Sequence, residues 1–550
     1  MSQLLSSLIE LPTQTLVLAT AVAVGAAALL VHAYLFDAVG KHGNLPPGPP
    51  VDSLFSGHRI PSTHPWRYLE KLTEEYGDIF TLRIGRSPLF VLGRASSAHR
   101  ILEKQSALSS SRPRLVLAGE LLSNNKRILL MPYGDQWRLY RKAMHETLND
   151  TVAKQYEPIQ EREARIATLH LGRLGQADGG GGDFQRVLHR YAASVIMQVT
   201  YDYQVQTLDD PLVRSVAQRG HALAMCIRPG ASVLDRYPLL EHVPTWLNPW
   251  KQEGLRLRKL EQELYLGQVI KVRERMERGE CAPCFVSKMT ERQQELGLTD
   301  LDVAGMSGSL FGAGSDTTAS ALSIFVMAVC RYPAVLARLH EELDRVVSRD
   351  RMPTFDDIPQ MPYVRATVQE VLRWRPVSAG GFQHSLTADV EYKGYVLPKG
   401  STVVGPHWSI SRDEHEYPEH DVFKPERFLQ SGGAEANGTS AQDEVKGTWF
   451  APARGSVAFG FGRRVCPGLN VAMRSLHINI ACMAWAFDIA QPDGRPERVD
   501  TFAFNSAANS HPLPFDATFT YRDPARKGVV EEENIATGEL DRIAASRGAT

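Results

Sequence analysis

One long apolar run stands near the N-terminus of this 550-residue chain. From Thr15 to Phe36 only His32 could carry a charge near neutral pH. A helix over this run spans roughly 33 Å, enough for the hydrocarbon core of a bilayer. No basic segment precedes the run, and it is too long for the apolar part of a cleaved secretory signal. The pattern therefore predicts a retained transmembrane helix over 15–36, with residues 1–14 on the lumenal side.

The rest of the chain shows the patterns of a mainly helical protein with small β-sheets. The proline-rich segment 37–50 cannot continue a helix and reads as a stiff hinge. Few charges interrupt the apolar residues of 300–331, which predicts a helix through the core. A β-hairpin is expected over 79–92. Further helices are expected at 66–76, 255–278, 356–375 and 469–489, and strands at 391–396 and 401–404.

Polar segments divide the chain further. A flexible link is expected at 178–183, an irregular stretch at 412–428 and a surface insertion at 434–446. The last residues, 522–550, read as a charged tail that is disordered in part. The prolines and tryptophans of 226–250 fit either a loop that dips toward a membrane or ordinary packing. One large domain is thus predicted over 51–521.

Composition narrows the class of partner and the compartment. The formal net charge is −1, and no basic run is interleaved with aromatic residues, so nothing points to a nucleic acid. Six cysteines in 550 residues do not suggest a disulfide framework. Cys281 and Cys284 form a single CxxC without a second pair at zinc spacing, and their role stays open.

The segment Phe459–Gly468 (FGFGRRVCPG) places Cys466 in a glycine-rich loop directly before an apolar helix. Glycines allow a close approach to a flat partner, and a helix N-terminus favours the thiolate. Arg464 could neutralise an acidic group on that partner. The loop therefore suggests a haem held by a cysteine, whereas a buried free cysteine is the simpler alternative.

Three other groups of residues could carry chemistry. Asp316 and Thr317 lie in the core helix, where they would open it locally and handle protons, or would belong to a small-residue helix contact. Glu370 and Arg373 are three residues apart, and Arg427 could complete a buried triad with them. Trp137 and Arg141 share a helix face and could present two donors to one anion, a weak signal by itself.

Taken together, these residues resemble the cytochrome P450 family, in particular its membrane-anchored microsomal members. Some sequence features are similar to those of fungal members. The loop fits Phe-x-x-Gly-x-Arg-x-Cys-x-Gly at each fixed position, and Ala313–Thr318 fits the family's helix motif. Glu370 and Arg373 fit Glu-x-x-Arg, and Pro425–Phe428 fits the motif that follows it. The order and spacing of the four motifs also match. The long polar stretch after Phe428 departs from the pattern and leaves that surface uncertain.

The resemblance implies a cytochrome P450 fold and haem b. It makes Cys466 the axial ligand of the iron, and Thr317 with Asp316 the proton-delivering catalytic pair. Glu370, Arg373 and Arg427 would be a structural brace. The residues implied to bind the haem are Cys466, Arg464, Trp137, Arg141, His384, Phe459, Gly462 and Gly468, with His384 standing where many relatives have arginine, so that it could titrate.

The implied activity is that of a monooxygenase that inserts one atom of O2 into a lipophilic substrate. Electrons would come from NADPH through a separate reductase, with cytochrome b5 as a second donor, at the endoplasmic reticulum membrane with the domain facing the cytosol. Secondary-metabolite biosynthesis is the leading pathway class. Two alternatives stay open: an O2-independent haem-thiolate isomerase or dehydratase, and a non-enzymatic membrane haem sensor.

Overall fold

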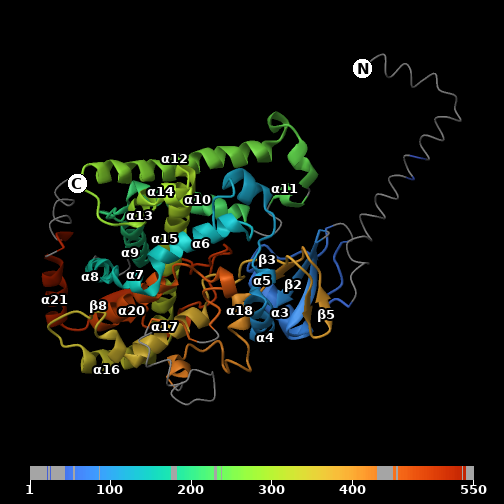
Figure 1. Cartoon of the computed structure of the whole chain (residues 1–550). Helices are drawn as coiled ribbons and strands as arrows, with labels where there is room; N and C mark the ends of the chain where they lie inside the picture. Colours follow the sequence, from blue (N-terminus) through green and yellow to red (C-terminus); the bar gives the residue numbers. More distant parts are fainter. Residues whose placement is uncertain are drawn as a thin grey trace.

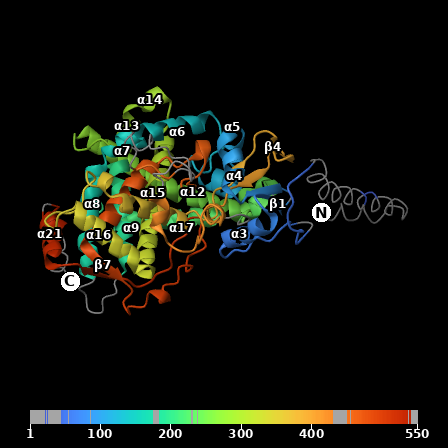
Figure 2. The ribbon, with the colours of Figure 1, turned by 90° about the horizontal axis from the view of Figure 1, so that it is seen from below.

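The computed structural model describes residues 22, 25, 44–53, 56–85, 87–174, 183–227, 232–236, 238–429, 450–453, 456–535 and 537–539. The predicted transmembrane helix over 15–36 and the predicted insertion at 434–446 lie outside these residues, as does nearly all of the predicted link at 178–183. Most helices gather at one end of the molecule, and the largest sheet lies with α3 (Pro65–Tyr76) at the other end (Figures 1 and 2).

The core is built around helix α15 (Asp300–Arg331), whose bounds are those predicted from the sequence. Thr299 and Asp302 cap its start reciprocally, each side chain accepting the other's backbone N–H. Among the described residues it alone is long and apolar enough to cross a membrane, but 72% of its most apolar window is buried inside the protein. It is therefore a core helix, as predicted.

Two helices that precede α15 in the sequence, α9 (Phe184–Tyr201) and α12 (Pro249–Glu277), pack against it. Helix α9 runs along it so closely that a Cβ on Gly314 would lie 2.6 Å from Ile196 Cγ1. Helix α12 crosses one edge of the molecule (Figure 1) and buries one face, including Leu257 and Tyr265, against α15 and η2 (Val116–Leu122). It begins six residues before the expected range, because Asn248 caps it and proline is tolerated in the first turn.

The other helices have the following bounds. Before α15 they are α4 (Ala95–Ala98), η1 (His99–Lys104), α5 (Ser106–Ser109), η2 (Val116–Leu122), α6 (Asp135–Leu148), α7 (Asp150–Lys154), α8 (Glu157–Leu174), α10 (Pro211–Cys226), α11 (Val233–Arg236), η3 (Pro238–His242), η4 (Thr245–Leu247), α13 (Phe285–Glu291) and α14 (Gln293–Leu296). After α15 they are α16 (Pro333–Val346), η5 (Ile358–Gln360), α17 (Pro362–Trp374), α18 (His407–Ile410), η6 (Pro425–Phe428), η8 (Gly462–Arg464), α20 (Leu469–Ala486), η9 (Pro496–Arg498) and α21 (Pro524–Ile535).

Three small sheets complete the described fold. The first has the order β1 (Ile79–Ile84), β2 (Ser87–Leu92), β6 (Thr402–Val404), β3 (His384–Ser385), with β2 and β6 parallel and the other pairs antiparallel. The predicted hairpin over 79–92 is thus confirmed. The other two sheets are the hairpin β4 (Val390–Tyr392) with β5 (Tyr395–Leu397), and β7 (Phe487–Ala490) with β8 (Thr518–Tyr521).

Besides the earlier start of α12, two predicted elements were wrong in extent. The range 391–396 is not one strand but the centre of the β4–β5 hairpin, because Lys393 and Gly394 adopt φ values of 48° and 79° and reverse the chain. The helix expected over 469–489 ends at Ala486, where the backbone becomes extended and pairs with β8. In both places an apolar run continues through the change of structure, so periodicity alone gives no boundary.

Part of the expected charged tail belongs to the folded body. Helix α21 packs against α8 and buries Arg526, Val530 and Asn534. The Asn534 amide donates to the Arg165 carbonyl at 3.1 Å. Residues 524–535 are therefore an ordered part of the domain, in contrast to the expectation of partial disorder for this stretch.

Candidate functional site

The loop around Cys466 has tight turns that only glycine accommodates easily. Gly460 and Gly462 have φ values of 79° and 52°, and a Cβ on Gly462 would lie 2.4 Å from the Leu102 carbonyl oxygen of η1. The Cys466 N–H donates to the Phe459 carbonyl at 2.8 Å and closes the loop. The loop therefore holds the cysteine in a fixed position directly before α20.

Cys466 is half-buried, and its sulfur receives polar contacts that favour a negative charge. Burial raises the pKa of the Cys466 thiol, while the backbone N–H groups of Gly468 and Leu469 and the charge of Arg141 act in the opposite direction. A positive ion bound to the sulfur would remove the cost that burial imposes on the thiolate. The surroundings of the sulfur thus fit a metal ligand.

Three half-buried arginines, Arg112, Arg141 and Arg464, lie close to this loop. Arg464 donates to the carbonyls of Ser110, Ile128 and Met131 at 2.6, 3.1 and 2.7 Å, and Arg141 donates to the Val465 carbonyl at 2.6 Å. Burial, followed by the charges of Arg112 and Arg141, lowers the pKa of Arg464 to about 8. The described residues contain no carboxylate in an ion pair with any of the three.

Such a set of cations is unfavourable without an anion, because their repulsion and desolvation are not offset. The indole of Trp137 stacks under Arg464, with the guanidinium carbon 4.5 Å from the ring centroid. Its Nε1–H is buried and has no hydrogen-bond partner among the described residues. Three guanidiniums and one free indole donor therefore fit a ligand that carries carboxylate groups.

Arg112 was not singled out from the sequence. The residue is half-buried, and the loss of hydration lowers the pKa of its guanidinium to about 10. It donates to the Leu129 carbonyl at 2.9 Å and acts electrostatically on both Arg464 and His384. No local pattern distinguishes Arg112 from Arg114, two residues later, which is exposed and paired with Glu120 and Glu241.

His384 is buried and its Nδ1 lies 2.7 Å from the Ser109 carbonyl oxygen. Burial and the neighbouring charges of Arg112 and Arg464 lower its pKa well below the ordinary value. The expectation that His384 could titrate near neutral pH is thus not met in this environment. Its neutral form donates from Nδ1 to Ser109 and leaves Nε2 as an acceptor, so donation to an anion requires a second proton.

A local opening of α15 at Asp316 and Thr317 was one of the two alternatives. The structure does not show it, because α15 is continuous from Asp300 to Arg331. The Thr317 hydroxyl donates to the Ala313 carbonyl one turn earlier at 2.9 Å, as threonines within helices often do. Both Asp316 and Thr317 nevertheless stay partly accessible. The Asp316 carboxylate accepts a hydrogen bond from His511 at 2.7 Å, a partner that the sequence did not indicate.

Glu370, Arg373 and Arg427 form the predicted buried triad. Arg373 donates to both oxygens of Glu370 at 2.7 Å, and Arg427 Nε donates to one of them at 3.3 Å. Glu370 is fully buried. Arg373 also donates to the carbonyls of Ser411 and His420, so the triad ties α17 to the irregular segment 411–428.

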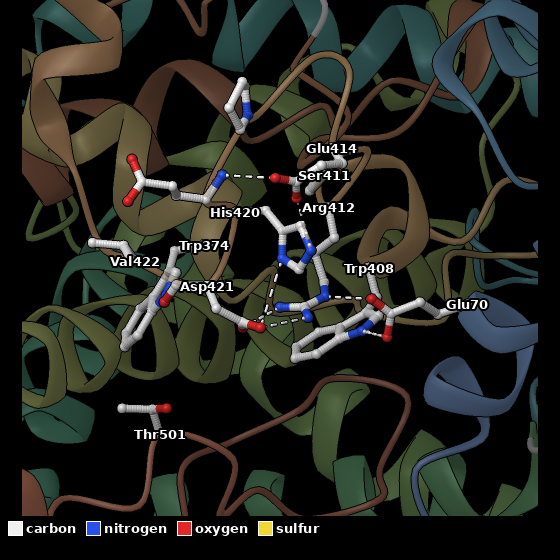
Figure 3. A network of polar contacts seen from close by, with 12 residues as sticks. Glu70, Trp374, Trp408, Ser411, Arg412, Glu414, His420, Asp421, Val422 and Thr501 are labelled. Atoms are coloured by element: carbon white, nitrogen blue, oxygen red, sulfur yellow. Dashed lines mark hydrogen bonds and ion pairs between the residues drawn. The ribbon is translucent and has the colours of Figure 1, made fainter. Parts of the chain in front are cut away.

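A second polar network continues from this triad (Figure 3). Arg412 binds the Asp421 carboxylate and also donates to Glu70 of α3 at 2.5 Å. The Trp408 indole donates to the other oxygen of Glu70 at 2.6 Å, and the Trp374 indole donates to the Asp421 carbonyl at 2.7 Å. These contacts connect α3, α17 and the 411–428 segment, which suggests a structural role for the network.

Comparisons with known proteins agree with the geometry. A family model described as Cytochrome P450 matches residues 45–517. Cytochrome P450 monooxygenases 64 and 88 of Postia placenta are 42% and 43% identical to this chain, and each match covers 87% of this chain and 91% of the relative. Cytochrome P450 monooxygenase aneD of Aspergillus aculeatus is 31% identical over 90% of this chain and 92% of its own length.

Proposed function

The chain belongs to the cytochrome P450 family and is an oxygenase, and on this premise we propose that it inserts one oxygen atom of O2 into a lipophilic organic substrate. The single observation that supports this best is the half-buried Cys466 sulfur just before α20, with hydrogen bonds from the backbone N–H groups of Gly468 and Leu469. The family implies haem with a cysteine thiolate ligand. When bound, haem supplies the redox chemistry of oxygen, and the thiolate promotes O–O cleavage.

The residues around Cys466 would hold the haem at several points. Cys466 Sγ would bind the iron, and Phe459 would limit the access of water to the sulfur. Arg112, Arg141 and Arg464, with the free Trp137 indole, would bind the propionate carboxylates by charge-assisted hydrogen bonds. Gly462 and Gly468 would let the loop approach the ring, and His384 would join this set only in its doubly protonated form.

The role of Arg112 can be tested by replacement with leucine. A hydrogen bond to a charged group contributes about 1.5–3 kcal/mol, so the affinity for haem should fall roughly tenfold or more. The ratio of Soret to protein absorbance after purification, and the rate of haem transfer to apomyoglobin, measure this loss. Arg114→Leu removes a nearby exposed arginine and should leave both values unchanged; an equal loss in the two variants would contradict the assignment.

Protons for the reaction would pass through Asp316 and Thr317. The Thr317 hydroxyl donates to Ala313 and can still accept from, or turn toward, a water molecule on the accessible side of α15. A placed hydroxyl and carboxylate can accelerate proton transfer. The presence of this pair favours the O2-dependent reaction over an isomerase or dehydratase, because only the former must deliver protons to O2.

Thr317→Ala should uncouple electron use from product formation. NADPH consumption should continue, but most of it should appear as hydrogen peroxide, because the variant lacks the hydroxyl that would place the proton for the productive reaction. The measurement compares product, hydrogen peroxide and NADPH in one reaction. Thr318→Ala, at the buried neighbouring position, is the control and should keep the wild-type ratio; unchanged coupling in Thr317→Ala would refute the relay role.

Several surface residues fit a membrane-bound enzyme that receives its electrons from a separate protein. The 15–36 helix would anchor the domain in the endoplasmic reticulum membrane as a single pass, facing the cytosol through the 37–50 hinge. Trp246, Leu247 and Trp250 are 75%, 57% and 41% exposed, an unusual group that fits an interface with lipid. Arg138 and Arg463, both exposed near Tyr133, would help to dock an NADPH-dependent reductase or cytochrome b5.

The substrate belongs to the lipophilic class in this proposal, and secondary-metabolite biosynthesis is the proposed setting. A metabolite comparison tests both: extracts of a host that supplies reductase are compared with and without the protein. New oxygenated lipophilic products that incorporate label from ¹⁸O2 are expected. Products that form without NADPH or reductase, and without the label, would replace the monooxygenase by the O2-independent alternative.

A further inference from the structure

Asp316 is paired with a histidine from a distant part of the chain. His511 Nε2 lies 2.7 Å from Asp316 Oδ2, and 195 residues separate the two in sequence. The His511 side chain is 18% exposed and that of Asp316 is 39% exposed. The pair therefore lies at the border between solvent and the helix position that carries Thr317.

The turn that carries His511 is fastened to α15. The Ser320 hydroxyl, one helical turn after Asp316, donates to the Ser510 carbonyl at 2.8 Å. Ser510 N–H in turn donates to the Val377 carbonyl at 2.6 Å. Because Asp316 and Ser320 lie on one face of α15, they bind two consecutive residues of the turn. This double attachment fixes the imidazole against the carboxylate.

A second imidazole lies beside the first. The ring of His189, from α9, stacks on His511 with centroids 5.7 Å apart and planes at 25°. Burial disfavours the charged form of Asp316, but the hydrogen bond from His511 and the charges of His511 and His189 outweigh it and lower the pKa of Asp316. Burial lowers the pKa of His189, against the charge of Asp316, and Asp183 at the start of α9 also acts on it. Among the described residues no lysine or arginine contributes to these shifts.

We propose that His511 supplies protons to Asp316 and positions its carboxylate, with His189 as the neighbouring imidazole. A proton that arrives on His511 Nδ1 allows the Nε2–H proton to move to Asp316 Oδ2, and no electrons are transferred. Asp316 then passes this proton toward Thr317. Imidazole suits the step because it exchanges protons near neutral pH, whereas a lysine or arginine at this place would hold its proton.

This inference rests on the proposed function, so wild-type protein must first show the thiolate signature and reductase-dependent NADPH consumption. If wild type shows neither, the proposed function fails. The test then measures NADPH consumption at saturating reductase and O2 from pH 6 to 8.5, without organic substrate. EDTA is present throughout, because two imidazoles and a carboxylate could also bind a divalent metal ion.

His511→Leu should slow NADPH consumption at pH 7 by at least about tenfold, as expected for the loss of a general acid. The wild-type rate should exceed the rate of the variant throughout this pH range. His511→Gln keeps a donor for Asp316 but cannot pass a proton, so it should resemble His511→Leu. A His511→Gln rate close to wild type would reduce His511 to a positioning residue and overturn the proton step.

A second measurement does not depend on activity. Diethylpyrocarbonate modification of His511, followed by peptide mass spectrometry, should be faster in Asp316→Asn because Nε2 is no longer held by the carboxylate. Asp316→Glu should restore the slower rate. Ser320→Ala should also speed modification by releasing the turn, while Ser323→Ala, whose hydroxyl bonds only to Ala319 of its own helix, should not. Equal modification of His511 in wild type and Asp316→Asn, or unchanged NADPH rates in both His511 variants, would refute the proposal.

Discussion

Replacing Cys466 with alanine should abolish the absorbance signature that reduced haem-thiolate proteins show with carbon monoxide, together with all product formation. The loop places one sulfur just before the start of α20, and alanine offers no atom that can bind iron. The spectrum of the reduced carbon monoxide complex, recorded on equal amounts of purified protein, is the measurement. The effect should be complete rather than graded, because no other residue of the loop carries a metal-binding atom of this kind.

Two variants make this result specific. Cys466→Ser keeps the size of the side chain and tests whether the thiolate, rather than a filled loop, is required; it should lose the signature as well. Cys226→Ala removes a half-buried cysteine of α10 and should leave the spectrum intact. Retention of the signature in Cys466→Ala would show that another group binds the iron and would remove the central support of the proposed function.

Local patterns predicted the elements whose cause is local. Helix α15 was placed correctly because its apolar run is long and because Thr299 and Asp302 are a cap that the sequence displays directly. The first hairpin was placed correctly for the same reason, since Gly85 marks its turn between two apolar runs. The Cys466 loop depends on glycines at fixed spacing, and the structure gives two of them the positive φ that such a loop needs.

The rest depends on contacts between distant segments. Neither Arg112 nor His511 stands in a pattern that marks it, and each acquires its surroundings from elements more than a hundred residues away. The helix boundary at Ala486 is set by pairing with β8 and not by any breaker in the sequence. The neutral state of His384 likewise follows from burial beside two arginines, which the identity of the residue cannot reveal.

The spacing Glu-x-x-Arg shows this limit clearly, because it occurs at several places in the chain and two of them have different surroundings. Glu370 and Arg373 are buried and joined by two hydrogen bonds of 2.7 Å. Glu342 and Arg345 have the same spacing on α16, but the Arg345 side chain is 66% exposed and lies 4.0 Å from the carboxylate. Only the tertiary structure separates a structural pair from a surface pair.

Arg373→Ala should therefore lower the free energy of unfolding strongly, whereas Arg345→Ala should hardly change it. Removal of Arg373 leaves the Glu370 charge buried, with Arg427 as a weaker partner at 3.3 Å, and frees the carbonyls of Ser411 and His420. Breaking a buried pair in this way costs about 3–5 kcal/mol, a large share of the roughly 5–15 kcal/mol that stabilises a typical protein. Because the Arg345 side chain is exposed and only 4.0 Å from Glu342, its pair should contribute no more than about 1 kcal/mol.

The yield of haem-loaded protein and the midpoint of urea unfolding measure the difference between these variants. Arg373→Ala should give little or no haem-loaded protein, since the 411–428 segment loses its connection to α17. A double variant, Glu370→Gln with Arg373→Met, removes both charges and should recover part of the stability lost in Arg373→Ala, because no unpaired charge stays buried. If Arg373→Ala and Arg345→Ala unfolded at the same urea concentration and retained equal haem, the triad would not be the brace that its geometry indicates.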